Sequence, residues 1–243
     1  MVRQCYIAGV GWLLLLLLWF SSSMAQGPQG PVRLVLDPGH GGKDRGAFGA
    51  QGVLEKDVAL VLAREIRDEA RNMGGFQVLL TREEDEAFSW SRRLDAAQGA
   101  DLWLSIHLNA DFQGKAHGPR VFYPMPKHNG PAPGAKGIPR NGEGVRAILQ
   151  DMATTKKTNE SLLLAEHIQR VLEAAWGVGS RPSRQAPLLG LPELECAGVL
   201  VEVGFLTHGG DLKGLQDQAR RRAMARSILR GLRAFLQDPR RAE

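Results

Sequence analysis

The sequence predicts a single α/β domain with a mostly parallel, twisted sheet flanked by helices. Two observations predict this class. Short apolar runs alternate along the chain with longer segments in which apolar residues recur every three or four positions, and this alternation is typical of parallel sheets covered by helices. A length of 243 residues, of which 43% are hydrophobic and 23% charged, suits one globular domain with a full-sized core.

The first half of the chain predicts three strands and two helices. "VRLVL" (32–36) is a buried strand that ends in Asp-Pro-Gly, "FQVLL" (76–80) is the second strand, and "DLWLSIH" (101–107) is the third. An amphipathic helix runs from Glu55 to the glycine pair after Met73, since glycine is the usual residue just past a helix C-terminus. A second helix is expected over 89–98.

The second half continues the pattern around one long loop. "PRVFYP" (119–124) predicts a strand at the edge of the sheet and "GVLVEVGFL" (198–206) a central one. Between them, residues 124–144 hold five prolines and five glycines and predict a functional or mobile loop. Helices are expected over 160–176 and at the C-terminus. With no repeat or second boundary, the predicted domain covers 32–237.

The N-terminus has the pattern of a secretory signal peptide. Arg3 precedes a 14-residue apolar run, 7–20, and small residues follow up to Ala25. The run is short of the roughly 20 residues that a membrane-spanning helix needs, although an uncleaved anchor stays open. We therefore expect a signal peptide over 1–25, a short lead-in over 26–31, a periplasmic or secreted mature protein, and no stable membrane insertion after cleavage.

Charge and cysteine content exclude several classes of protein. The formal net charge of +5 would suit an anionic partner, but no nucleic-acid-binding motif is present, so no nucleic-acid partner is expected. The basic run 220–222 is predicted to lie on the solvent-exposed face of the C-terminal helix.

The cysteine content predicts a fold without disulfides. Cleavage after residue 25 would remove Cys5 and leave Cys196 alone, so the fold depends on its core and not on a disulfide. We interpret Cys196 as a buried small residue.

Three polar residues lie at predicted strand ends or inside a strand. His40 follows the first strand in a loop of five glycines, His107 closes the third strand, and Glu202 interrupts the apolar "VLVEVGF". The carboxyl ends of parallel strands converge on one crevice, where ligands bind. A carboxylate inside such a strand is costly unless it is paired or close to a metal. The three residues therefore predict one site.

A fourth residue, Glu55, completes a metal-binding hypothesis. Alone, Glu55 is explained as an acid at a helix N-terminus, and His107 alone as a core histidine. Together, His40, Glu55 and His107 form a common catalytic zinc set that leaves one position open for water. Glu202 would then be the general base. His208, just after the last strand, is the reserve ligand. No nucleophile-elbow or His-Glu-x-x-His motif competes with this hypothesis.

The motifs "LVLDPGHGGKDRGAFG", "LLTREED", "ADLWLSIHLNAD" and "GVLVEVGFLTH" together resemble the zinc-dependent N-acetylmuramoyl-L-alanine amidases of bacterial cell walls. The resemblance spans about residues 32–237. It implies one Zn²⁺ held by His40, Glu55 and His107, and catalysis by Glu202. It also implies hydrolysis of the amide between N-acetylmuramic acid and L-alanine in peptidoglycan, in cell-wall remodelling or daughter-cell separation. Two alternatives stay open: a catalytically silent peptidoglycan-binding or regulatory protein, and a zinc hydrolase of another wall amide.

Three features depart from the resemblance or extend it. Leu108 stands where relatives more often have a small residue, and is expected to narrow the cleft. Relatives often have Asn in place of His208, which argues against an essential ligand there.

Some Gram-negative members of the family carry a helix that blocks the site until an activator protein binds. The corresponding segment here, 124–150, is rich in Pro and Gly, so we expect no autoinhibition, with Glu143 as the occluding ligand if it exists. A monomer is expected.

Overall fold

The computed structural model describes residues 30–126 and 143–242. The predicted signal peptide, 1–25, lies outside the described residues, as does all of the lead-in but its last two positions. Residues 32–243 form one compact unit, which confirms the predicted α/β class. Among the described residues, no helix is both long enough and apolar enough to span a lipid bilayer.

The unit contains one six-stranded sheet in the order β2-β1-β3-β6-β4-β5. Its strands are β1 (Val32–Pro38), β2 (Phe76–Leu80), β3 (Leu102–Asn109), β4 (Arg120–Pro124), β5 (Arg184–Ala186) and β6 (Ala197–Phe205). Every neighbouring pair is parallel except β4 and β6, which run antiparallel. The carboxyl ends of β1, β3 and β6 therefore meet at one edge of the sheet.

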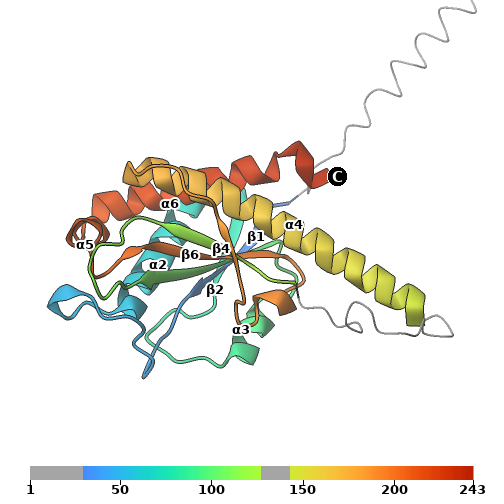
Figure 1. Cartoon of the computed structure of the whole chain (residues 1–243), viewed down its shortest axis with the longest axis horizontal. Helices are drawn as coiled ribbons and strands as arrows, with labels where there is room; N and C mark the ends of the chain where they lie inside the picture. The colour runs from blue at the N-terminus through green and yellow to red at the C-terminus, as the bar shows by residue number, and fades with distance from the viewer. Residues whose placement is uncertain (1–29, 127–142, 243) are drawn as a thin grey trace, which may run out of the picture. The chain divides into compact units, whose positions relative to one another are not determined.

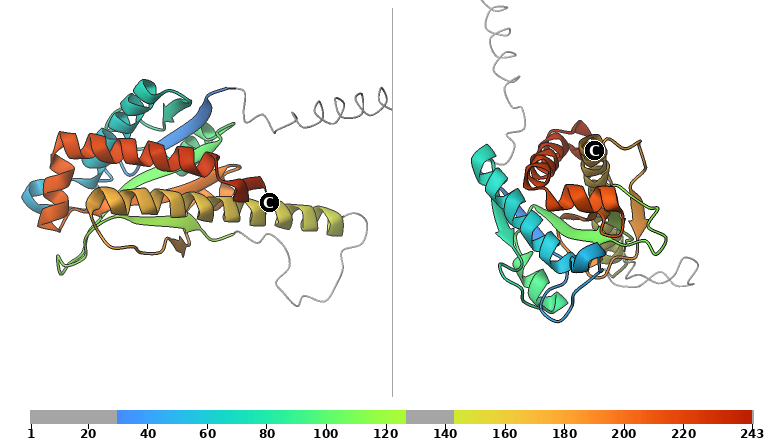
Figure 2. Two further views of the ribbon diagram at one scale, coloured as in Figure 1. Left: turned by 90° about the horizontal axis from the view of Figure 1, so that it is seen from above. Right: turned by 90° about the vertical axis from the view of Figure 1, so that its left-hand side faces the viewer.

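Helices cover both faces of this sheet unequally (Figures 1 and 2). The α-helices of the unit are α2 (Glu55–Met73), α3 (Trp90–Ala96), α4 (Glu143–Trp176), α5 (Gly209–Gln216) and α6 (Gln218–Leu236). The main core lies between the sheet and α2, α4 and α6. On the opposite face, α3 and the short 3-10 helix Leu191–Glu193 close a smaller cluster around Trp103.

Strand alternation assigns each residue of β3 to one of the two faces. Leu104, Ile106 and Leu108 point into the main core, whereas Trp103 belongs to the smaller cluster, because successive side chains of a strand point to opposite sides. His107 therefore lies on the less covered face. This corrects the expectation for Leu108: its side chain is 3% exposed in the main core and does not narrow the cleft.

Helix α2 holds Glu55 beside the carboxyl ends of the central strands, because the helix packs closely on the sheet. Ala59, Ala63 and Ala70 are fully buried against the sheet, and such small side chains let the helix approach the strands closely. The helix stops at Gly74, which has φ 68°, a backbone conformation that favours glycine. Its first residue, Glu55, is thereby fixed beside the carboxyl ends of the central strands.

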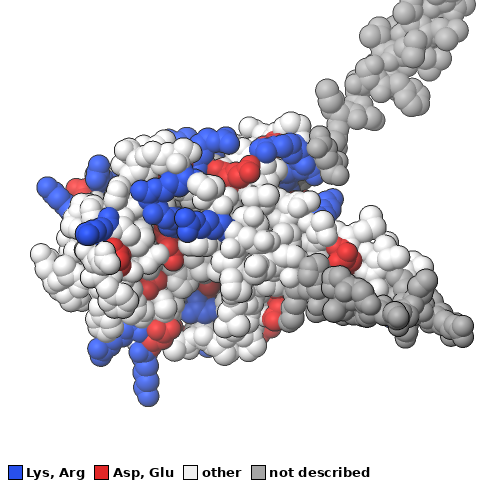
Figure 3. All heavy atoms as spheres, viewed as in Figure 1, with Lys and Arg blue, Asp and Glu red and all other residues white. Residues whose placement is uncertain are grey.

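Three expectations about the second half of the chain are wrong. Strand β4 is not at the edge, because β5 pairs with it on the outer side. Helix α4 begins at Glu143 and not near 160. Within the basic run, Arg221 does not face solvent: it lies against Glu65 of α2, with two N–O distances of 3.0 Å. Elsewhere on the face drawn in Figure 3, Lys and Arg side chains lie beside Asp and Glu side chains.

Candidate metal centre and catalytic edge

The loop after β1 brings His40 to the sheet edge in a constrained conformation. His40 has φ 60°, which is uncommon and costly for a residue with a side chain. The preceding Gly39 touches His107 so closely that a Cβ atom there would overlap the imidazole ring. A glycine at this position therefore allows the His40 loop to pack directly against the end of β3.

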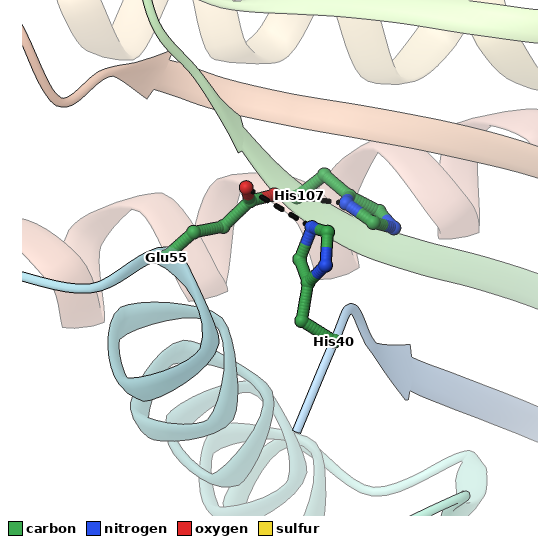
Figure 4. A group of neighbouring side chains, drawn as sticks. All are labelled: His40, Glu55 and His107. Atoms are coloured by element: carbon green, nitrogen blue, oxygen red, sulfur yellow. Dashed lines mark hydrogen bonds and ion pairs between the residues drawn. The ribbon is translucent and has the colours of Figure 1, made fainter. Parts of the chain in front are cut away.

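His40, Glu55 and His107 meet at this edge from a loop, a helix and a strand (Figure 4). The Glu55 carboxylate lies between the two rings: Oε2 is 3.0 Å from His40 Nε2, and Oε1 is 2.9 Å from His107 Nδ1. One ligand atom from each residue lies within 4.8 Å of the others. The centroids of the two imidazole rings are 5.0 Å apart and the rings are nearly perpendicular. His40 Nε2 and His107 Nδ1 both face the Glu55 carboxylate.

The donor set fits a divalent cation such as Zn²⁺. Two imidazole nitrogens and one carboxylate oxygen are ligand types of catalytic zinc sites, which keep a further position for water or substrate. Gly46 helps to keep the space open, since a Cβ there would lie 2.5 Å from Glu55 Oε2. In the described residues this is the one group of three or more acidic, His or Cys side chains with that geometry.

The Glu55 carboxylate is held in its charged form. Burial alone would raise its pKa, but hydrogen bonds from His107, His40 and two backbone amides outweigh burial, and the pKa lies well below its usual value. Those amides belong to Ala47 and Leu108, at 2.7 and 3.0 Å. A carboxylate that stays ionised at every physiological pH is a suitable metal ligand.

Asp44 orients His40, although its place in the sequence did not mark it as a site residue. His40 Nδ1 is 2.8 Å from Asp44 Oδ2, which leaves Nε2 to face Glu55. A carboxylate on the second nitrogen of a ligating imidazole fixes the ring and raises its basicity. The signal was available in "HGGKD", where an acid follows the histidine at a short distance.

Glu202 lies beside the metal-binding candidates but is not one of them. It is paired in register with His107 across β3 and β6, so both side chains lie on the same face of the sheet. Burial raises the pKa of Glu202, and a hydrogen bond from Asn109 Nδ2 opposes that rise. A buried carboxylate with a raised pKa next to the three metal-binding candidates is suited to accept a proton.

A network of buried polar side chains holds the loop that carries His40. Asp37 is 2% exposed and accepts hydrogen bonds from Thr81, Ser105 and Arg93. Arg93 also donates to the carbonyl of His40 at 2.8 Å. Sequence reasoning missed this network, because its members come from β1, β3, α3 and the loop after β2.

Arg82 forms the second part of the same support. Its guanidinium, 1% exposed, donates to the carbonyls of Pro38, Gly39 and Lys56 at 2.8 to 3.0 Å. These carbonyls belong to the His40 loop and to the first turn of α2. One buried side chain therefore joins the two segments that carry His40 and Glu55.

A cleft of about 360 Å³ opens on the two histidines. Its polar lining includes His40, His107 and Arg93, and Phe88, Trp90 and several leucines form an apolar wall. Leu189, in the loop after β5, is 82% exposed at its rim. The cleft can admit a substrate that combines polar and apolar groups.

The other candidates lie away from the three-residue cluster. His208 caps α5 and pairs with Asp211 at 3.1 Å, and His167 pairs with Asp238 at 2.9 Å. Cys196 is partly buried against the smaller cluster. The 127–142 part of the segment considered for autoinhibition, and the Glu143 side chain, lie outside what the structure describes.

Residues 34–234 match the family model described as N-acetylmuramoyl-L-alanine amidase. The chain is 33% identical over 224 residues to AmiA of Salmonella typhimurium, covering 85% of this chain and 77% of that protein.

Solved structures of similar proteins give the same fold. AmiC2 of Nostoc punctiforme matches with a TM-score of 0.66 and 27% identity, over 87% of this chain and 100% of that one. The CwlD amidase of Clostridioides difficile, solved in complex with the GerS lipoprotein, matches with a TM-score of 0.65 and 25% identity, over 84% and 98%.

Proposed function

Because this chain belongs to the N-acetylmuramoyl-L-alanine amidase family, we propose that it hydrolyses the amide between N-acetylmuramic acid and L-alanine in peptidoglycan. One observation carries the proposal: the ligand atoms of His40, Glu55 and His107 lie within 4.8 Å of one another, with Glu202 in register beside His107. This is the residue set that metal-assisted amide hydrolysis requires.

His40, Glu55 and His107 would hold one Zn²⁺ ion. When bound, the ion supplies a Lewis acid that polarises an amide carbonyl and lowers the pKa of water. Asp44 keeps His40 Nε2 directed at the site, and the ionised Glu55 supplies the negative charge. Arg82 and Arg93 hold the loop that carries His40.

Glu202 would move the proton. As a general base it takes a proton from the attacking water, and it then returns that proton to the nitrogen of the departing L-alanine. The raised pKa of Glu202 supports this role, because a stronger base accepts the proton more readily. The hydrogen bond from Asn109 holds the carboxylate in position.

The cellular setting follows from the substrate. Peptidoglycan lies outside the cytoplasmic membrane, which agrees with the signal-peptide pattern of residues 1–25. We propose a periplasmic or secreted monomer that acts in cell-wall remodelling or daughter-cell separation.

The complex of CwlD with a lipoprotein supports a second proposal, that a partner protein binds and activates this chain.

Digestion of purified peptidoglycan, with products identified by mass, tests the proposal. The protein is assayed with Zn²⁺, with a chelator, and as Glu202→Gln. Stem peptides that begin at L-alanine should appear only with the zinc-loaded wild type. Release of fragments cut at another amide would identify a different wall hydrolase. Stoichiometric zinc binding without release, even after addition of candidate activators, would identify a binding protein instead.

A further inference from the structure

An imidazole, a carboxylate and a guanidinium stand in one row across the less covered face of the sheet. His107 of β3 is the register partner of Glu202 of β6, and Glu202 is the register partner of Arg120 of β4. Directly opposed residues of neighbouring strands point to the same face. The row therefore runs from the metal-binding candidates through the proposed base to an arginine.

Two further arginines gather around Arg120. Arg184 of β5 is the register partner of Phe122, which lies two positions after Arg120 and so shares its face. Arg181 and Arg120 both donate to the carbonyl of His117, at 2.8 and 3.4 Å. Their guanidinium groups are thus held close together. Arg184 is exposed, and the other two are half-buried.

None of the three guanidinium groups forms an ion pair with a described carboxylate. Burial and the charges of Arg181 and Arg184 lower the pKa of Arg120, and the charges of Glu202 and Asp211 oppose that change only in part. Three like charges close together are unfavourable unless an anion joins them, and arginine pairs well with carboxylates because its planar fork can donate two parallel hydrogen bonds.

We propose that Arg120, Arg181 and Arg184 form a subsite for a carboxylate of the peptide that leaves during the reaction. This inference rests on the proposed function. In this proposal the scissile amide lies over His107 and Glu202, and the peptide continues along the row past Glu202, toward β4 and β5. A carboxylate on the residue after L-alanine lies about 7 Å from the scissile nitrogen in an extended chain. Adjacent strands are about 4.8 Å apart, so this carboxylate comes within reach of the arginines.

The ligand class is an α-carboxylate on the second residue of the stem peptide. A γ-linked glutamate leaves such a carboxylate free, whereas the corresponding isoglutamine replaces it with a neutral amide. The subsite would therefore distinguish these two forms of substrate.

A purely structural role for the arginines makes a different prediction. Arg120 also donates to the carbonyl of Pro119, so its loss could disturb the backbone and reduce turnover of every substrate equally. Loss of a carboxylate subsite reduces turnover only where the substrate carries the carboxylate.

The test uses the zinc-loaded full chain and two muramoyl peptides that differ only in glutamate or isoglutamine at the second residue. Variants are Arg184→Met, Arg120→Met and Arg120→Lys, with Arg222→Met on the exposed face of α6 as the control. The wild type and the control should favour the glutamate substrate by about tenfold to a hundredfold in kcat/KM. The Met variants should lose most of this preference, measured as the ratio of the two kcat/KM values within each variant, and Lys should restore part of it.

Binding of the free L-alanyl-γ-D-glutamate and L-alanyl-D-isoglutamine dipeptides, followed by calorimetry, separates this inference from the proposed function. Arginine-dependent preference for the glutamate form, in a chain that cleaves neither substrate, would reject the amidase and keep the subsite. Equal use of both substrates by the wild type, or equal losses on both in the Met variants, would overturn the subsite whether or not the chain is an amidase.

Discussion

Glu202 can be identified as a candidate site residue from the sequence, whereas the residues that contact it cannot. A carboxylate among Val, Leu and Phe is conspicuous in the sequence, because burial of an unpaired charge is costly. Asn109 and Asp44 are ordinary loop and strand-end residues, and only the fold reveals that they bond Glu202 and His40. Sequence reasoning finds residues whose type conflicts with their surroundings, and misses those whose type is unremarkable.

The hydrogen bond between Asn109 and Glu202 should be visible in the pH dependence of turnover. Asn109 stabilises the ionised carboxylate, so Asn109→Ala should raise the pKa of Glu202 above its already raised value. Because the base must be ionised, activity is lost as pH falls through this pKa. The acid limb of the kcat–pH profile should therefore move to higher pH. The exposed Asn159→Ala on α4 is the control; an unmoved limb in Asn109→Ala would reject Glu202 as the titrating base.

Cys196 should react slowly with alkylating reagents in the native protein. Burial raises the pKa of its thiol to about 11, and the thiolate is the reactive form. At pH 8 only about one thiol in a thousand is then ionised. Iodoacetamide labelling of the peptide that contains Cys196, followed by mass spectrometry, should be slow until the protein is denatured. Equal rates in native and denatured protein would contradict this.

Secondary-structure elements with strong apolar periodicity were predicted, and those without it were not. Strands β1, β2, β3 and β6 and helix α2 agree closely with the predicted segments. Strand β5 has only three residues, none fully buried, so its sequence carries no alternation. The first half of α4 was underestimated because residues 153–160, "ATTKKTNE", are polar on all sides and hide the helical period.

Arg82 acts between elements, and its loss should weaken metal binding. Arg82→Met would remove three hydrogen bonds to the carbonyls of Pro38, Gly39 and Lys56, although Pro38 keeps its bond from Arg93. A hydrogen bond to a charged group contributes about 1.5–3 kcal/mol, so the free energy of unfolding should fall by roughly 3 kcal/mol or more. Since these carbonyls fix His40 relative to Glu55, zinc affinity should fall about tenfold to a hundredfold.

A matched variant separates the two effects of Arg82. Arg221→Met breaks the bonds of a less buried arginine, to Glu65 and to the end of α5, away from the proposed metal centre. It should lower stability with little change in zinc affinity, measured by competition with a chromophoric chelator at a temperature where both variants are folded. Equal affinities in the two variants would show that Arg82 supports the fold alone.

For the molecule as a whole, the candidate metal centre joins parts of the chain that are far apart in sequence. His40 follows β1, Glu55 begins α2, and His107 lies near the end of β3, so the three donors come together only in the folded sheet. The sequence could predict this convergence, because the carboxyl ends of parallel strands share an edge. It could not predict the row that continues through Glu202 to Arg120, since that requires the antiparallel register of β4.

Zinc should therefore stabilise the whole unit. A ligand that binds only the native state at a thousand times its Kd adds about 4 kcal/mol, or roughly 10 °C in Tm for a domain of this size. Calorimetry with zinc and with a chelator measures the difference, which should vanish in His107→Ala because a ligand is lost. It should persist in Glu202→Gln and in His208→Ala, since Glu202 would move protons and His208 lies with Asp211. If His208→Ala removed the difference, His208 would have to join the metal centre, and the three-residue site proposed for His40, Glu55 and His107 would be incomplete.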